Sequence, residues 1–173
     1  MEEDQRPQQG TFDCDGPDFH DPRVATIRVK AMHNKRIYRD IEFGMDTFLD
    51  EVAECIVDAF GWDCDHCYGF YGSLGYRVRG SAEAYELFFD LSREDGVPYQ
   101  GPYHFQGVKD SRVRDAFGVR GKKMQFLFDY GEDYRFELEV RSVADEGHGL
   151  TYPRITASKG EMGDQYPAYD DGD

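Results

Sequence analysis

The chain has 173 residues, of which 39% are hydrophobic and 15% aromatic, and this favours one domain with a core rich in Phe and Tyr. Its formal net charge of −15 at pH 7 repels phosphate backbones and anionic membrane surfaces at ordinary salt, so nucleic acid is disfavoured as a partner. No apolar run approaches the roughly 20 residues that span a bilayer, and the N-terminus lacks a signal-peptide pattern, so we expect a cytoplasmic protein that does not bind membranes.

The acidic residues are mainly Asp and the basic residues mainly Arg, a bias that indicates a halophilic host with concentrated internal salt. At about 1 M salt the Debye length falls to roughly 3 Å, so repulsion between the acidic side chains would be screened. We therefore predict a midpoint of thermal unfolding that rises between low and molar KCl.

The two ends of the chain differ in composition from its middle. Residues 1–21 are mostly acidic and polar, and residues 160–173 end in Tyr-Asp-Asp-Gly-Asp. Segments of this kind bury too little apolar surface to become ordered by themselves. We expect a disordered acidic tail over residues 1–21, one domain over residues 22–159 and a flexible acidic C-terminal tail over residues 160–173.

Two strands and one helix are expected first along the domain. Residues 24–30 and 37–43 alternate in side-chain character around a polar connector, which predicts an antiparallel pair. Residues 48–60 carry apolar side chains at helical spacing, with Asp46 or Thr47 as the N-cap and a glycine beyond the last turn. One face of this helix must cover the sheet.

The middle of the chain predicts less regular structure. Residues 68–71 and 76–79 flank a glycine-bearing turn and predict a second hairpin. Residues 84–91 fit either a short strand or a helical turn, and residues 92–107 predict a loop because they contain two prolines and three glycines. Apolar side chains at helical spacing in residues 110–117 predict a short helix.

The clearest strand alternation lies in residues 124–143. Apolar side chains recur at every second position on both sides of Gly131-Glu132-Asp133, which suits a hairpin loop with a bulge. Residues 151–157 follow as an extended segment, and Pro153 favours an edge position. These elements predict the α+β class: a single domain with a curved, mostly antiparallel sheet on which one long amphipathic helix and one short helix pack.

Several short motifs occur in the same order as in a known family. They are Ile37-Tyr38-Arg39-Asp40, Gly61-Trp62, Asp65-His66-Cys67-Tyr68-Gly69-Phe70, Phe128-Asp129-Tyr130-Gly131-Glu132-Asp133-Tyr134 and Tyr152-Pro153-Arg154-Ile155. With these motifs the chain resembles the plasmid pRiA4b ORF-three-like family over about residues 24–167. The resemblance implies an α+β fold with a helix packed across a curved sheet, and it implies little about function because the family is largely uncharacterised.

Two positions depart from the pattern of that family. Tyr68 stands where the family has the second His of a pair, and Ile155 stands where it has a Cys after Pro-Arg. A metal site built from those groups would be incomplete in this chain. Some members bear a transposon-resolvase label, which leaves a mobile-element-associated nucleic-acid-binding protein as one alternative. DNA binding that survived molar salt would support it.

The Cys64-x-x-Cys67 motif provides two ligands of the kind that structural zinc uses. His66, Cys14 and His20 are candidates for the remaining ligands. The alternative is that these cysteines are ordinary reduced thiols, as in most intracellular proteins. A redox pair is disfavoured because the flanking aspartates would raise the thiol pKa. We therefore expect reduced thiols and no cofactor, with zinc as the alternative.

Asp65, His66 and the hairpin acids Asp129, Glu132 and Asp133 have two interpretations. If the segment after the helix lies beside the hairpin tip, they form a His and carboxylate set that suits a metal-dependent hydrolase. Alternatively, Asp and Gly satisfy the needs of a tight turn, and the His orients a loop. Unchanged divalent-ion affinity in the Asp129→Asn and His66→Ala variants would exclude the hydrolase.

No phosphate-binding loop ahead of a helix, no Gly-x-Ser-x-Gly and no His-Glu-x-x-His motif is present in the sequence. We therefore expect a non-enzymatic binding or accessory module with an unidentified protein partner. Aromatic side chains give rigid contact area with a polar tip, which suits a contact surface. The expected surface consists of Trp62, Asp65, His66, Asp129, Glu132, Asp133 and Tyr134.

Overall fold

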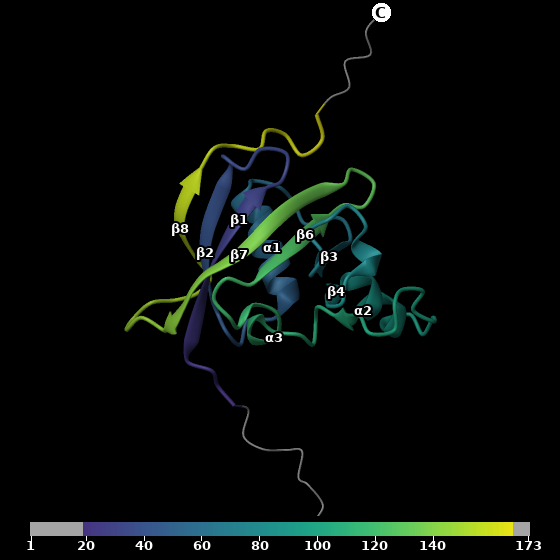
Figure 1. The fold of residues 1–173 in the computed structure, drawn as a ribbon, viewed down its shortest axis with the longest axis horizontal. Helices are drawn as coiled ribbons and strands as arrows, with labels where there is room; N and C mark the ends of the chain where they lie inside the picture. The colour runs from purple at the N-terminus through teal and green to yellow at the C-terminus, as the bar shows by residue number, and fades with distance from the viewer. Residues whose placement is uncertain (1–18, 168–173) are drawn as a thin grey trace, which may run out of the picture.

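Eight strands pair into one open sheet in the computed structural model, which describes residues 19–167. Their order across the sheet is β5-β4-β3-β6-β7-β1-β2-β8, and every pair except β4–β5 is antiparallel (Figure 1). In chain order the elements are β1 (Arg23–Ala31), β2 (Tyr38–Gly44), α1 (Leu49–Ala59), β3 (Tyr68–Tyr71), the 3₁₀ helix η1 (Val78–Gly80), β4 (Ala84–Glu86), α2 (Leu87–Glu94), β5 (Gln106–Gly107), α3 (Val113–Phe117), β6 (Lys123–Phe128), β7 (Tyr134–Asp145) and β8 (Arg154–Lys159).

The predicted α+β class with a mostly antiparallel sheet is confirmed. The described chain contains three α-helices where the sequence predicted two, because residues 84–91 adopt both of their alternatives in turn. They form the short strand β4, and α2 begins at the next residue and continues to Glu94. Residues 92–107, expected as a loop, therefore contain the end of α2 and also β5.

The predicted first hairpin is confirmed, with Ile27 of β1 opposite Ile41 of β2. Strand β1 also pairs with β7, so it lies inside the sheet. The register shifts once between Thr26 and Ile27 in that pairing, and once between Asp40 and Ile41 where β2 pairs with β8. Irregularities of this kind bend strands, which fits the curved sheet. Strand β8 is an edge strand, as Pro153 predicted.

The β6–β7 hairpin is also confirmed, with Phe126 opposite Phe136. Its loop is longer than predicted and runs from Asp129 to Asp133, since β6 ends at Phe128. Asp129 and Asp133 have φ values of 56° and 60°, a left-handed conformation that Asp tolerates better than most residues. Because the alternation stops at residue 129, Tyr130 packs on the opposite face from Phe128.

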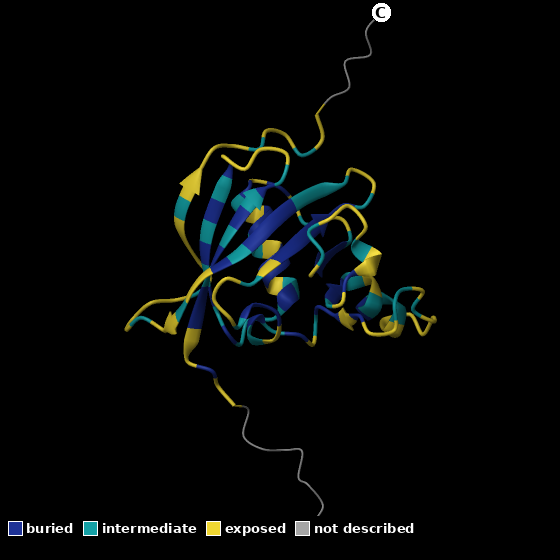
Figure 2. Cartoon of the chain, viewed as in Figure 1, coloured by how far each residue is buried: buried dark blue, intermediate teal, exposed yellow. Residues whose placement is uncertain are grey.

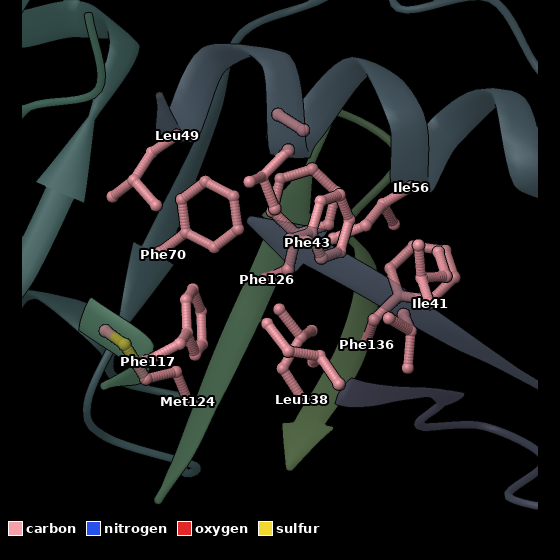
Figure 3. Packing of buried hydrophobic residues seen from close by; sticks show 14 of the residues in the cluster. Ile41, Phe43, Leu49, Ile56, Phe70, Phe117, Met124, Phe126, Phe136 and Leu138 are labelled. Atoms are coloured by element: carbon pink, nitrogen blue, oxygen red, sulfur yellow. The ribbon is translucent and has the colours of Figure 1, made fainter. Parts of the chain in front are cut away.

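Helix α1 covers one face of the sheet with its apolar side (Figures 1 and 3). Leu49 and Ile56 of the helix are fully buried and pack in one cluster with Phe43, Phe126 and Phe136 of the sheet. Burying a side chain of this size stabilises the fold by roughly 1.5–3 kcal/mol. The apolar faces that alternation gives the strands and helical spacing gives α1 thus pack together in one aromatic core.

The N-cap of α1 is Phe48, and the prediction of Asp46 or Thr47 was wrong. The carboxylate of Glu51 accepts a hydrogen bond of 3.3 Å from the amide of Phe48, which satisfies one donor at the helix start. Asp46 instead accepts hydrogen bonds from the Asp21 amide and the Arg114 guanidinium. The predicted end at Gly61 is confirmed, since this residue follows the C-cap with φ 78°.

The predicted strand at residues 76–79 was wrong. Strand β3 pairs with β4 and β6 instead, and residues 78–80 form the 3₁₀ helix η1. The reason is a buried amide in the sheet: Nε2 of Gln125 donates hydrogen bonds of 3.0 Å to the carbonyls of both Ser73 and Gly75. These bonds hold the chain after β3 against the sheet, so it cannot turn back as the next strand.

A second, smaller core lies on the face of the sheet opposite α1. Its buried members are Tyr71, Ala84, Phe105 and Leu127, and those on β3, β4 and β6 alternate along their strands with members of the main core. The sheet is therefore buried on both faces near β3, β4 and β6, as the blue strands of Figure 2 show. None of the helices within residues 19–167 is both long and apolar enough to cross a membrane.

Candidate functional site

Trp62 and Tyr134 form the centre of the predicted surface. Gly61 follows the C-cap of α1 with a positive φ, and the Trp62 ring after it packs against Tyr134 in a tilted arrangement, with ring centroids 4.5 Å apart. The indole Nε1 donates a hydrogen bond of 2.9 Å to the carbonyl of Gly163, and the Tyr134 hydroxyl donates to the carbonyl of Gln165. Two aromatic donors thus hold two backbone carbonyls of the C-terminal segment.

His66 lies beside this pair in the loop between α1 and β3. Its Nδ1 atom is 2.8 Å from Oδ1 of Asp65, 2.7 Å from the hydroxyl of Tyr166 and 3.6 Å from Oδ2 of Asp129. The hydrogen bond with Asp65 raises the pKa of His66, and the charge of Asp129 raises it further. The same bond lowers the pKa of Asp65. The protonated imidazole is therefore favoured at this position.

Asp129 is a turn residue as well as a neighbour of His66. It is buried, and its Oδ1 accepts hydrogen bonds of 3.0 and 3.2 Å from the amides of Gly131 and Glu132. Glu132 is exposed, and Asp133 forms an ion pair with Arg135 at 2.8 Å. The structure thus brings Asp65, His66 and Asp129 into contact, whereas Glu132 is exposed and Asp133 pairs with Arg135. These contacts agree with the turn interpretation of the hairpin acids.

Residues 163–167, which the sequence assigned to a tail, complete this site. The side-chain amide of Gln165 exchanges two hydrogen bonds of 2.9 Å with the backbone of Asp63, one to its amide and one to its carbonyl. The hydroxyl of Tyr166 donates to Asp65 at 3.0 Å. We call the surface formed by Trp62, Asp63, Asp65, His66 and Tyr134 the segment-binding surface. No local pattern in the sequence indicates these contacts, because each joins residues about a hundred positions apart.

A pocket of about 440 Å³ lies next to the segment-binding surface. Trp62 and Tyr134 form part of its wall, and Met162 and Asp164 contribute from the C-terminal segment. His33, from the connection between β1 and β2, lines it too. Space for a further side chain therefore remains between the segment and the sheet.

The cysteines predicted as zinc ligands lie in apolar surroundings. Cys64 packs against the main core, and burial raises the pKa of its thiol to about 11. Burial also raises the pKa of Cys67. His20 binds Asp46, and Cys14 lies outside the described residues. Within residues 19–167, no three His, Cys, Asp or Glu side chains are arranged so that they could hold a metal ion together.

A second group of polar residues lies on the opposite face of the sheet and was not identified from the sequence. The carboxylate of Glu86, at the end of β4, is bound by the hydroxyls of Tyr71 and Tyr99 beside a second pocket. Glu86 gives no signal in the sequence because its two partners, Tyr71 and Tyr99, lie on two other segments, 15 and 13 residues away.

Comparisons with known proteins identify a family and a similar fold. The model of the family described as plasmid pRiA4b ORF-3-like protein matches residues 23–165. A crystal structure of a protein of unknown function from Methanosarcina mazei Go1 is similar with a TM-score of 0.59 and 13% sequence identity, and the match covers 79% of this chain and 68% of that chain. At this identity the likeness concerns the fold alone. No curated protein matches the chain.

Proposed function

This chain belongs to the plasmid pRiA4b ORF-3-like family, and we propose that it is a non-enzymatic binding module that recognises a polypeptide segment of a protein partner. The contact site in this proposal is the segment-binding surface, with the neighbouring pocket as a place for one partner side chain. In this proposal, the chain's own residues 163–167 occupy the same site into which a partner segment fits.

One observation carries the proposal, namely that the surface binds a segment through its backbone. Trp62 and Tyr134 donate to the carbonyls of Gly163 and Gln165, so they contact groups that every polypeptide has. Hydrogen bonds to main-chain groups supply affinity in peptide recognition, and contacts to side chains supply specificity. Aromatic residues with a polar tip are also the types that most often dominate protein interfaces.

Two side chains of the bound segment account for selectivity in this proposal. The Gln165 amide pairs with the backbone of Asp63, and the Tyr166 hydroxyl meets Asp65 and His66. We therefore expect a partner segment to carry a side-chain amide followed directly by a phenol side chain, as Gln165 and Tyr166 do. A segment without these groups leaves the polar atoms of the surface without their partners, which weakens binding.

The test uses Trp62 as a reporter, since it is the single tryptophan of the chain. In the full chain the tethered segment competes at an effective concentration of about 1 mM, so a free peptide binds weakly. In a Gln165→Ala, Tyr166→Phe double variant the tethered segment is weakened. A peptide with the sequence of residues 161–167 should then change the Trp62 emission in a saturable way.

The matched control is the same peptide with Ala in place of its Gln and Tyr. We expect this control to bind at least about tenfold more weakly, because it lacks the hydrogen bonds to Asp63 and Asp65. Equal binding of both peptides would show that the surface does not select a segment. An unchanged Trp62 emission in the double variant at saturating peptide would refute the proposed binding site.

A further inference from the structure

The second pocket lies across the sheet from α1 and has a volume of about 450 Å³. It is lined by η1, by the junction of β4 and α2, by the loop after α2 and by the β6–β7 loop. Pockets that bind small molecules typically have volumes of about 300–1,000 Å³ and combine apolar walls with a few polar groups. This pocket has that size and composition, and it is separate from the segment-binding surface.

Glu86 is the polar centre of the pocket. The side chain is buried, with 8% of its surface exposed, although it carries a carboxylate. The Tyr71 hydroxyl donates a hydrogen bond of 2.5 Å to Oε1, and the Tyr99 hydroxyl donates to Oε2. The hydroxyls of Tyr130 and Tyr71 are 2.6 Å apart. Because the Tyr71 proton is already directed at Glu86, Tyr130 must be the donor to Tyr71.

Two tyrosine protons are therefore directed at the carboxylate of Glu86, and the third, from Tyr130, is directed at the hydroxyl oxygen of Tyr71. Desolvation raises the pKa of Tyr71, Tyr99 and Tyr130, so these hydroxyls stay protonated as donors. A ligand in the pocket consequently meets oxygen lone pairs and no free hydroxyl proton from this network. Each oxygen of Glu86 has one tyrosine donor and can accept another hydrogen bond. The network thus selects a hydrogen-bond donor.

The apolar part of the pocket favours a donor that is positively charged. Phe88 and Tyr130 stand with ring centroids 5.2 Å apart and form an aromatic wall beside Glu86. An ammonium group has three donors and no acceptor, and it is attracted both to a carboxylate and to aromatic faces. The net charge of −15 also raises the local concentration of cations around the protein.

Arg79 limits which cations fit. It is exposed and lines the same pocket, and its charge acts on Tyr99 and Tyr130. A second positive charge on the ligand would be repelled at this side of the pocket, because like charges at close range are unfavourable. The pocket therefore suits a molecule with one ammonium group and an apolar body.

We propose that this pocket binds a small primary monoamine, with its ammonium group on Glu86 and its apolar body against Phe88 and Tyr130. The probe is benzylamine, which is charged at neutral pH and carries one aromatic ring. Benzyl alcohol and benzoate are the neutral and anionic analogues of similar shape, and putrescine is the diamine. Isothermal titration calorimetry on the full chain should give saturable binding of one benzylamine, at least about tenfold weaker binding of benzyl alcohol and putrescine, and none of benzoate.

Variants test whether benzylamine binds in this pocket or elsewhere on the surface. Glu86→Gln removes the charge and should weaken benzylamine binding at least about tenfold. Glu83→Gln is the matched control, because Glu83 also accepts a tyrosine hydrogen bond, from Tyr85, but does not line the pocket. Phe88→Ala changes a partly exposed side chain, so the fold should tolerate it even if Glu86→Gln does not fold. It should weaken binding about threefold to tenfold through the loss of the aromatic wall.

Three results would overturn the proposal. One is benzoate binding as tightly as benzylamine, which would make Arg79 the main contact. Another is an unchanged affinity for benzylamine in folded Glu86→Gln and Phe88→Ala variants, which would place the amine elsewhere. The third is the absence of saturable amine binding by the wild-type chain at millimolar benzylamine. None of these results depends on whether the segment-binding surface accepts a peptide.

Discussion

The Nε atom of Arg39 lies 2.9 Å from the backbone carbonyl oxygen of Ala59, the last residue of α1, and donates a hydrogen bond to it. The NH1 group of the same side chain donates to the carbonyls of Tyr38, Lys159 and Gly160 at 2.9–3.1 Å. One buried cation thus joins the C-terminal end of the helix, strand β2 and the exit of strand β8. A positive charge also interacts favourably with the dipole of a helix at this end.

We predict that Arg39 cannot be replaced by Lys without a loss of stability. A lysine ammonium has three donors on one atom and cannot reach carbonyls on opposite sides as the planar guanidinium does. Arg39→Lys should lower the free energy of unfolding by about 1–2 kcal/mol and Arg39→Ala by about 2–4 kcal/mol, measured by urea denaturation. The exposed Arg36 provides the control, since Arg36→Ala should change stability by less than about 0.5 kcal/mol. Wild-type stability of Arg39→Lys would contradict this role.

Gly69 is required by the tyrosine that covers it. A Cβ atom at this position would lie 2.6 Å from the hydroxyl oxygen of Tyr71 and 2.8 Å from two of its ring carbons. Tyr71 is fully buried, so its ring has little room to move, and Gly69→Ala should cost about 1–3 kcal/mol of unfolding free energy. Gly80→Ala is the control, because nothing lies within 4 Å of a Cβ there. Equal stability of the two variants would show that the Tyr71 ring is not held in place.

Local patterns in the sequence predicted the elements whose two faces differ. Alternation in β7 and helical spacing in α1 and α3 were clear because each of these elements has one buried side and one more exposed side. Strand β6 was predicted as the partner of β7 in the hairpin, although both of its faces are buried. The strand predicted at residues 76–79 does not form, because the side chain of Gln125 holds the preceding residues Ser73 and Gly75 through two hydrogen bonds. Gln125 lies some fifty residues further along the chain, so no local pattern shows this contact. The assignment of residues 84–91 was ambiguous because β4 has only three residues, too few to show the alternation of a strand.

Local patterns in the sequence likewise indicated only part of the candidate site. Trp62 and His66 follow the predicted helix closely in the sequence, and in the structure Trp62 packs against Tyr134 while His66 lies 3.6 Å from Asp129. The contacts of Gln165 and the hydrogen bonds of Glu86 could not be predicted, since a single sequence does not encode which distant residues meet. Acidic and glycine-rich composition favoured a tail, yet Trp62 and Tyr134 donate hydrogen bonds to the backbone of Gly163 and Gln165, and the Gln165 side chain pairs with the backbone of Asp63.

Protonation of His66 should stabilise the folded chain at mildly acidic pH. Asp65 raises the pKa of His66 through a hydrogen bond, and the charges of Asp129 and Glu132 raise it further, while Tyr166 contributes a neutral hydroxyl. Because the folded pKa is above the unfolded value of about 6.5, this stabilisation is fully present below that pH and is lost as the pH rises through the folded pKa.

Two measurements check this pH dependence. Titration of the His66 ring by NMR should give a pKa above that of an unstructured peptide, and Asp65→Asn should bring the pKa closer to the peptide value. The stability difference between wild type and His66→Gln should shrink from pH 6 to pH 8.5. A His66 pKa at or below the peptide value would contradict the ion-pair geometry.

The thiols of Cys55 and Cys64 should be unreactive in the folded chain. Burial raises the pKa of each to about 11, and the thiolate is the form that reacts with disulfide reagents and binds zinc. In a Cys14→Ser, Cys67→Ser background, the reaction of these two thiols with Ellman's reagent at pH 8 should be about a hundredfold slower than in guanidinium-unfolded protein. Fast labelling of the native chain, or one zinc per chain that is lost in a Cys64→Ser, Cys67→Ser variant, would contradict this prediction.

The stability of the chain should increase with salt. Its 35 acidic and 20 basic side chains leave an excess of 15 negative charges, so repulsion outweighs the attraction in surface ion pairs, each of which contributes at most about 1 kcal/mol. Molar KCl screens both effects and should therefore raise the midpoint of thermal unfolding. Neutralising exposed acids, as in Asp95→Asn with Glu132→Gln, should raise the midpoint at low salt and reduce its dependence on KCl. A midpoint that stayed level or fell in molar KCl would show that ion pairs, rather than net charge, dominate the surface electrostatics.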